Sequence, residues 1–338
     1  MMAKNAGITL GEDTADCITM WCCGRDFLLI RPTLRVRLAR LPGVDWTRLL
    51  DFRIEMEKVI RVFPRKTIAT PTDDGARIGV GPGLFDEADR VEISVAFTWD
   101  LPAAERLERE WRHVAPTSMG GPALMTRGEE FTPGRFVRKG YTITSRGCPN
   151  KCWFCSVWRR EGGTVRELPI QDGYDILDDN LLACSEAHVR AVFAMLARQP
   201  ERPKFTGGLE AKILKAWHCA ELRKLKPQRL YFAYDTPDDL DPLREAGKML
   251  REAGFTTASH VLSAYVLCGW PKDTMEGAEK RMRETLDAGF TPMAMLYRDK
   301  TGQRDTAWRL WARQWARPTI VYSKSNPTGQ AAAHGTEE

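Results

Sequence analysis

Apolar residues follow two alternating patterns along this chain, one typical of strands and one typical of helices, most regularly after residue 140. Short runs rich in β-branched and aromatic residues predict strands, and apolar residues three or four positions apart predict helices between them. The strands are expected at residues 141–144, 176–180, 204–208, 229–235, 260–269 and 292–297. The helices are expected at residues 185–198, 210–224, 239–253, 275–288 and 308–317. Alternating strands and helices predict a parallel sheet, and six such units are too few to close an eight-stranded barrel.

The first part of the chain also shows an α/β pattern, though a less regular one. Residues 91–97 alternate like a strand, residues 102–114 read as a helix that Asp100 caps, and a glycine turn follows at 118–123. This order is typical of a small doubly wound unit. A rough apolar stripe predicts a further helix over residues 44–61.

A polar connector at residues 129–138 separates the two patterns. We therefore expect an α/β domain at 1–135, a larger domain at 136–320 and a disordered tail at 321–338. The expected fold class is α/β: a parallel sheet of six strand–helix units, too few for a complete TIM-like barrel, preceded by a smaller doubly wound domain.

Composition narrows the class of protein. The chain has 338 residues, of which 43% are hydrophobic and 28% charged, as in a globular protein. No apolar run approaches the length of a membrane span, and the N-terminus lacks a signal-like segment, so we expect a cytoplasmic protein with no membrane partner. In that reducing compartment the nine cysteines are thiols or metal ligands. The net charge of +5 permits an anionic or nucleic-acid partner without arguing strongly for one.

Three of the cysteines, Cys148, Cys152 and Cys155, form a C-x-x-x-C-x-x-C motif directly after the strand predicted at 141–144. Thiolates are soft ligands for iron–sulfur clusters and for zinc. A closed zinc site needs four ligands, and no Cys or His follows Cys155 until Cys184. Three thiols therefore favour a cluster with one metal position left for another ligand.

This motif, with Phe154 directly before its third cysteine, resembles that of the radical S-adenosylmethionine (SAM) superfamily, and in particular its bacteriophage-encoded members. The resemblance implies that Cys148, Cys152 and Cys155 hold a 4Fe–4S cluster and that Phe154 lies near the adenine of SAM. It implies reductive cleavage of SAM to a 5′-deoxyadenosyl radical, an electron donor such as flavodoxin or ferredoxin, and a partial (β/α)6 barrel. It identifies neither the substrate nor any catalytic residue.

In parallel α/β folds, ligands bind at the carboxyl ends of the strands. The second predicted strand ends at Asp179 and Asn180, and the third at Gly207, Gly208 and Glu210. Superfamily members use a Gly-Gly-Glu segment to bind the amino group of SAM, and this chain has Gly-Gly-Leu-Glu one strand late. The amino-group ligand therefore stays open between these two segments.

The later strand ends supply further candidates. Asp235 follows the fourth strand and could accept hydrogen bonds from the ribose hydroxyls. Gly269 follows the fifth, where the backbone could approach the adenine, and Tyr297 and Arg298 follow the sixth as a substrate-facing pair. The competing interpretation is that each of these carboxylates caps a helix and each glycine turns the chain.

The first domain resembles the cobalamin-binding domain that precedes the radical SAM core in one branch of the superfamily. The resemblance lies in its strand, its helix and the Gly120-Gly121-Pro122 turn. None of the five histidines lies in the Asp-x-His-x-x-Gly motif that ligates cobalt in that branch. We therefore expect a degenerate domain without the corrinoid, and keep a cobalamin-dependent methyltransferase as an alternative.

The last predicted helix and the cysteine motif each leave a different function open. Trp308, Trp311 and Trp315 share one side of that helix, and an arginine row, Arg309, Arg313 and Arg317, occupies another. Such a helix could stack on bases and neutralise phosphates, as expected of a radical SAM enzyme that modifies a nucleic-acid base in phage DNA hypermodification. Docking of the tryptophans on the barrel is the simpler interpretation. The cysteine motif would also suit a non-catalytic protein that binds zinc.

Overall fold

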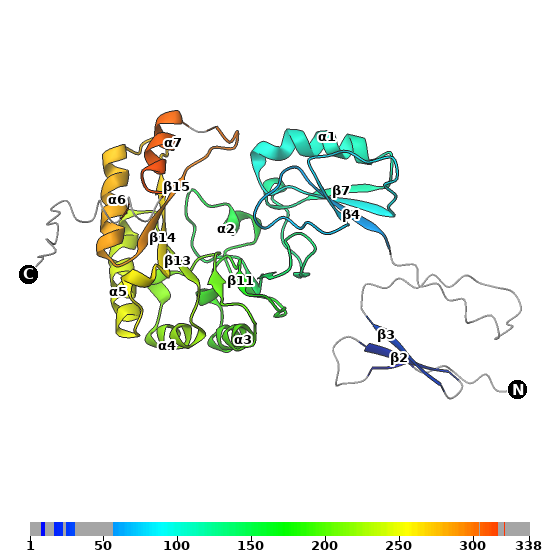
Figure 1. Ribbon diagram of the computed structural model, residues 1–338, viewed down its shortest axis with the longest axis horizontal. Coiled ribbons are helices and arrows are strands. Elements are labelled where there is room, and N and C mark those ends of the chain that lie inside the picture. The colour runs from blue at the N-terminus through cyan, green and yellow to red at the C-terminus, as the bar shows by residue number, and fades with distance from the viewer. Residues whose placement is uncertain are drawn as a thin grey trace, which may run out of the picture.

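A computed structural model describes residues 8–10, 17–22, 25–30, 57–303, 305–316 and 321, the first three ranges as backbone only. It is a mixed α/β structure with two parallel sheets, each with its own hydrophobic core. Figure 1 shows the two parts side by side, the smaller around β4 and β7 and the larger around β11 to β15. A third, antiparallel sheet joins β1 (Ile8–Leu10), β2 (Cys17–Cys22) and β3 (Arg25–Ile30).

The smaller part is a four-stranded parallel sheet in the order β5-β4-β6-β7. Its strands are β4 (Val59–Phe63), β5 (Ala76–Ile78), β6 (Arg90–Ser94) and β7 (Thr117–Gly120), and its α-helix is α1 (Leu101–Trp111). Leu107 and Trp111 of α1 are fully buried against apolar residues of β4 and β6. The strand, helix and turn predicted between residues 91 and 123 are thus confirmed.

Two predictions for this part are wrong in detail. Residues 59–61, expected to end a helix, belong to β4, because the β-branched run Val59-Ile60-Arg61-Val62 fits a half-buried strand better than a helix; residues 44–56 lie outside the described residues. Asp100 precedes α1 but makes no capping bond. Its buried carboxylate instead accepts hydrogen bonds from Arg65, which follows β4.

The connector after β7 is attached to the smaller sheet. Arg61 donates to the carbonyl oxygens of Gly134 and Arg135. Arg135 pairs in turn with the buried Glu92 of β6, and this carboxylate raises the pKa of the Arg135 guanidinium. The polar residues that marked a boundary in the sequence therefore bind the connector to the first core.

The larger part is a six-stranded parallel sheet whose strands follow one another in chain order from edge to edge. The strands are β8 (Tyr141–Thr142), β11 (Asp175–Ile176), β12 (Lys204–Phe205), β13 (Arg229–Tyr234), β14 (Leu262–Cys268) and β15 (Thr291–Leu296). The helices are α2 (Val157–Arg160), α3 (Glu186–Ala197), α4 (Ala216–Leu225), α5 (Leu240–Glu252), α6 (Met275–Asp287) and α7 (Thr306–Arg313). All six predicted strands are confirmed.

Burial along β13 shows which face of this sheet the helices cover. Leu230, Phe232 and Tyr234 are buried in the core with residues of α3 to α6, whereas Tyr231 and Ala233 are half-buried and point the other way. In the adjoining strands, Tyr265 pairs with Ala233, and Met293 pairs with Tyr265. Figure 1 shows the helices along the outer side, so these side chains line the inner face.

Three details of the larger part differ from the sequence prediction. The helix expected from residue 210 begins only at Ala216, after the short 3-10 helix Ala211–Ile213. A small antiparallel pair, β9 (Ser145–Arg146) with β10 (Arg166–Glu167), was not predicted. Val321, assigned to a disordered tail, is buried in the core; residues 322–338 lie outside the described residues.

The last helix follows the simpler of the two interpretations. Trp311 and Trp315 are buried in the core and Trp308 packs against it, while Arg309 and Arg313 are exposed. Two of its three tryptophans are therefore not available to stack on a ligand, and Arg317 lies outside the described residues. Among the described helices, the structure contains none with the length and apolar character that crossing a lipid bilayer requires.

Candidate functional site

The three cysteines of the motif lie on one loop between β9 and α2, beyond the carboxyl end of β8. All three are half-buried free thiols. Burial raises the pKa of Cys152, and the neighbouring Cys155 and Cys148 raise it further. Within the described residues, no three His, Cys, Asp or Glu side chains are arranged as they stand to hold a metal ion. The three thiols therefore share one loop and are near enough for Cys148 and Cys155 to influence the pKa of Cys152.

A buried carboxylate supports the start of this loop. Asp178, which is 1% exposed, accepts hydrogen bonds from the backbone N–H and the hydroxyl of Thr144, both at 2.6 Å, and from the Ser145 hydroxyl at 2.7 Å. Its burial raises the pKa of the carboxyl group. Asp178 thus ties the end of β11 to the two residues that lead into the cysteines.

A buried group of charges holds the other side of the loop. Glu161 accepts hydrogen bonds from Arg160, Arg166 and the backbone N–H of Gly128. Burial opposes its ionisation, but Arg160 and Gly128 keep the pKa of Glu161 below its ordinary value. These contacts fasten the segment after the cysteines to the connector from the smaller part.

Asp179, one of the predicted SAM ligands, belongs to this support. Its carboxylate accepts a hydrogen bond from the backbone N–H of Gly147 at 2.9 Å and lies within 4.0 Å of Arg146 and 3.9 Å of Arg160. Burial raises its pKa. Asp179 is thus hydrogen-bonded to the backbone at the start of the cysteine loop.

Asn180 and Glu210, from the two segments between which the sequence left the amino-group ligand open, meet at the first cysteine. The Asn180 Nδ2 lies 2.6 Å from Glu210 Oε2 and 3.5 Å from Cys148 Sγ. The Asn180 Oδ1 is buried and accepts no hydrogen bond from the described residues. A buried acceptor of this kind is costly unless a ligand satisfies it. This pair therefore presents one acceptor and one carboxylate beside Cys148.

Gly207 and Gly208 shape the turn that brings Glu210 to this place. A Cβ atom at Gly207 would lie 2.2 Å from the carbonyl oxygen of Asp178, and Gly208 has a positive φ of 95°. Only glycine allows the two strand ends to approach this closely.

We expect Gly207→Ala to destabilise the protein by about 1–3 kcal/mol, because its methyl group would press on the Asp178 backbone and separate Asn180 from Glu210. The urea midpoint of iron-free protein measures this effect. Gly163→Ala is the matched control, since a Cβ there meets nothing within 4 Å. Equal midpoints for the two variants would contradict the prediction.

Asp235 follows β13, close enough to the cysteine loop for its charge to raise the pKa of Cys152. Its Oδ1 accepts a hydrogen bond from the backbone N–H of Leu267 at 3.1 Å. Burial, together with the neighbouring Asp239, raises the pKa of Asp235 to about 6. Asp235 is thus a carboxyl group that changes charge just below neutral pH.

This shift predicts a difference in pH dependence between the wild type and Asp235→Asn. The folded pKa lies above the ordinary 3.8, so the folded state holds the proton more tightly and loses stability as pH rises from about 4 to 6. Asparagine keeps an acceptor for Leu267 but has no charge. Iron-free Asp235→Asn should therefore nearly match the wild type near pH 4 and be more stable by about 3 kcal/mol at pH 7. A constant difference across urea denaturations at both pH values would contradict this.

Two further predicted residues have other neighbours. Phe154 is half-buried, with its ring edge-on to Trp153 at 5.4 Å. Gly269 has a positive φ of 75°, and a Cβ there would lie 3.0 Å from the ring of Trp308 in α7. Close packing on Trp308 accounts for glycine at this position without any ligand.

An aromatic group beside the cysteines was missed in the sequence. Trp153 lies inside the motif and is 51% exposed. The centre of its ring is 6.3 Å from that of Trp270, which follows β14, and 5.9 Å from that of Tyr297, which follows β15. The sequence signalled only Tyr297, because the other two partners come from distant segments. The cysteine loop therefore contacts the last two strand ends of the sheet through aromatic rings.

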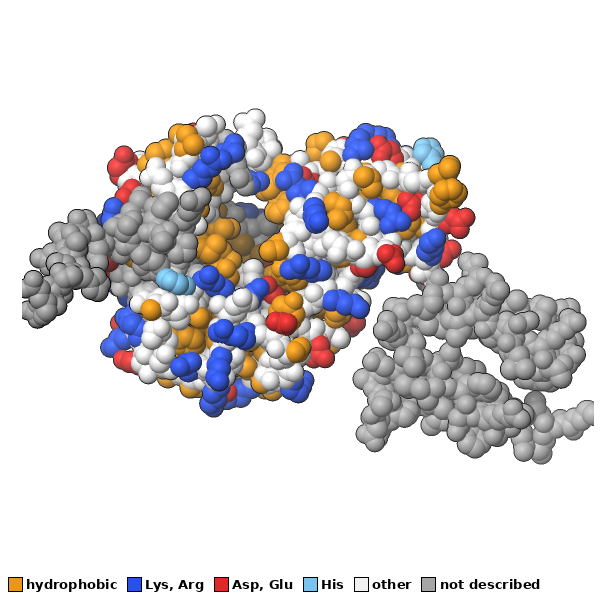
Figure 2. Space-filling model, in the orientation of Figure 1, with side chains coloured by type: hydrophobic (Ala, Val, Ile, Leu, Met, Phe, Trp, Pro, Cys, Tyr) orange, Lys and Arg blue, Asp and Glu red, His pale blue; other side chains and the backbone are white. Residues whose placement is uncertain are grey.

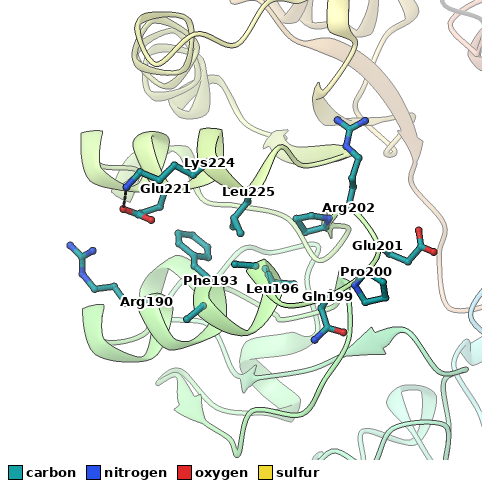
Figure 3. Close-up of a pocket in the computed structure, with 13 residues that line it drawn as sticks. Arg190, Phe193, Leu196, Gln199, Pro200, Glu201, Arg202, Glu221, Lys224 and Leu225 are labelled. Atoms are coloured by element: carbon teal, nitrogen blue, oxygen red, sulfur yellow. Dashed lines mark hydrogen bonds and ion pairs between the residues drawn. The ribbon is translucent and has the colours of Figure 1, made fainter.

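A pocket lies elsewhere in the larger part. It has a volume of about 410 Å³ between α3 and α4, with Phe193, Leu196 and Leu225 inside and Arg190 and Arg202 at its rim (Figure 3). Pro203, in its wall, directly precedes β12, so the pocket is at the amino-terminal end of the strands. The cysteines lie at the carboxyl ends, so we assign this pocket no part in their chemistry.

Comparison with known proteins adds no family assignment. No protein-family model matches the chain, and no curated protein matches its sequence. The function therefore has to be argued from the site.

Proposed function

We propose that the protein is a radical SAM enzyme that holds a 4Fe–4S cluster through Cys148, Cys152 and Cys155. The observation that supports this most is the meeting of Asn180 and Glu210, from two successive strand ends, at Cys148. A thiol loop alone is compatible with zinc. Thiols next to an unsatisfied amide oxygen and a carboxylate suit a cluster together with a cationic ligand.

The donor set fits such a cofactor pair. Three soft thiols are available. Burial raises the pKa values of Cys152 and Cys155, so metal binding must displace protons from these two. When bound, the cluster would supply one electron to cleave SAM, giving the 5′-deoxyadenosyl radical that abstracts hydrogen from the substrate. A flavodoxin or ferredoxin would be the electron donor. The protein contributes binding, orientation and exclusion of water.

Each residue of the site then has a defined task. Asn180 Oδ1 and the Glu210 carboxylate would bind the amino group of SAM, and Asp235 would accept hydrogen bonds from its ribose. Phe154 would lie against the adenine. Asp178, Asp179 and Glu161 support the loop and touch no ligand.

The finer fold belongs to the same proposal. Six parallel strands in sequential order, with helices outside and the cysteines after the first strand, suit a partial (β/α)6 barrel. The order β5-β4-β6-β7 of the smaller sheet suits the doubly wound type to which cobalamin-binding domains belong. Gly121 packs against the Val95 backbone, where a Cβ would lie 2.7 Å from the carbonyl oxygen. We propose a degenerate domain of this type, without corrinoid.

Anaerobic purification and reconstitution test the function. The protein should bind about four iron and four sulfide ions per chain, and with SAM and dithionite it should release 5′-deoxyadenosine. Protein that carries zinc but neither iron nor sulfide would instead support a zinc-binding protein without this activity.

A further inference from the structure

The aromatic contacts at the cysteine loop continue toward the smaller part of the molecule. Tyr297, next to Trp153, is followed by Arg298, whose guanidinium lies 4.6 Å from the centre of the Trp99 ring. Trp99 in turn stacks on Phe97 at 4.8 Å, with the two rings 9° from parallel. Phe97 and Trp99 follow β6. Aromatic residues from three distant segments of the chain thus form a line from the cysteine loop to the smaller sheet.

The loop after β15 joins the two parts along this line. The Thr98 hydroxyl donates to the carbonyl oxygen of Lys300 at 2.8 Å, and Gly302 packs so closely on Trp99 that a Cβ would lie 2.5 Å from the ring. Figure 2 shows a hollow between the two parts, with apolar side chains in it and Lys and Arg side chains around its opening. The aromatic line therefore runs across a cleft with a basic rim.

The inner face of the larger sheet adds to the apolar surface near this cleft. Tyr231 and Tyr265 stack at 4.7 Å, 5° from parallel, and Met293 and Met295 are 39% and 48% exposed. Large side chains of this kind are rarely left exposed together on a single face without a binding role. Aromatic and thioether groups favour a flat, polarisable ligand.

Most of the charged side chains along the same line are positive. Arg298 lies over Trp99, and Lys151 in the cysteine loop and Lys300 after β15 are exposed. Asp299 lies between them, but its carboxylate already accepts two hydrogen bonds from Thr301. Flat rings interspersed with Arg and Lys are the surface that single-stranded nucleic acids require, since bases stack and phosphates are neutralised.

We propose that this cleft binds a single-stranded nucleic acid and presents one base beside the cysteine loop, with Trp153 as its stacking platform and Arg298 as a phosphate contact. The assignment rests on the proposed function only for the chemistry that would follow; binding itself requires neither cluster nor SAM. The last helix, in which Trp311 and Trp315 are buried, has no part in it.

Fluorescence anisotropy with the full-length, iron-free chain tests the proposal. The probes are a fluorescein-labelled 12-nucleotide single strand of mixed sequence, as DNA and as RNA, and the corresponding duplex. We expect one or both single strands to bind more tightly than the duplex, with affinity falling steeply as salt rises. The stronger single-strand arm identifies the type of nucleic acid. Failure of both single strands to bind, or equal binding of the duplex, would overturn the proposal.

Variants locate the binding site. Trp153→Ala should weaken single-strand binding about tenfold and Trp153→Phe much less, because one stacked base contributes about that factor. Arg298→Ala should lower the slope of log Kd against log salt by about 1. Arg309→Ala and Arg313→Ala, on the exposed side of α7, are the matched controls and should bind like the wild type. Binding that is lost in these controls but kept in Trp153→Ala would place the nucleic acid on α7 and refute the cleft.

The two proposals can fail separately. Iron content and SAM cleavage are measured without an oligonucleotide, and strand binding is measured without iron. If the protein cleaves SAM but binds neither DNA nor RNA single strands, the proposed function stands and the proposed substrate class is wrong.

Discussion

Cys152→Ala is expected to abolish both iron binding and the release of 5′-deoxyadenosine, the largest effect that any single substitution in this protein should have. Two thiols cannot hold the cluster that three are proposed to share, and no fourth Cys or His lies within the loop to replace the missing ligand. Anaerobic reconstitution followed by iron and sulfide assays and detection of 5′-deoxyadenosine gives the measurement.

Cys184→Ala provides the matched control. Cys184 is also a half-buried thiol, but it follows β11 and packs against the core, and burial raises its pKa to about 11. It should keep iron, sulfide and SAM cleavage. If Cys152→Ala still cleaves SAM, the reactive centre lies elsewhere in the chain.

Asp178→Ala should cause the largest loss of stability, at least about 3 kcal/mol. The substitution leaves the Thr144 N–H buried without its acceptor, deprives two buried hydroxyls of theirs, and opens a cavity where the carboxylate was. Urea denaturation of the iron-free protein measures the change.

Asp287→Ala, exposed in the last turn of α6, is the control and should change stability by no more than about 0.5 kcal/mol. Because Asp178 holds the residues that lead into the cysteines, Asp178→Ala should also bind less iron than the wild type after reconstitution. A variant as stable as the control would show that the carboxylate is not the support described above.

The sequence predicted best those elements whose signals are local. Ser185 caps α3 by accepting from the backbone N–H of His188, and Gly254 follows the end of α5 with a positive φ, so these two helix ends are marked by residue types with a strong local preference. The buried and half-buried residues of β13 alternate along the strand, although every residue after Arg229 is apolar or aromatic. The helix predicted at 210–224 begins only at Ala216, because Lys215 is extended and its backbone N–H donates to the ring of His218. The apolar pattern of the sequence did not reveal this contact.

The candidate site was predicted in its parts but not in its connections. Asn180 and Glu210 were both chosen from strand ends, yet their hydrogen bond joins positions 30 residues apart. Glu161 was missed altogether, since its partner Gly128 lies 33 residues away and a lone Glu after an Arg carries no signal. Asp178 and Asp179 look alike in the sequence, and only the structure shows that Asp178 binds Thr144 and Ser145 while Asp179 binds Gly147.

The bridge between Thr98, Trp99 and residues 298–302 has an evolutionary consequence. The six-stranded sheet has free edges at β8 and β15, and the loop that leaves β15 reaches the smaller part across this open side. Insertions or deletions in one short surface loop can change the width of the entrance while the strands and the thiols keep their places. Related proteins could thus come to bind ligands of a different size through a few mutations in this loop.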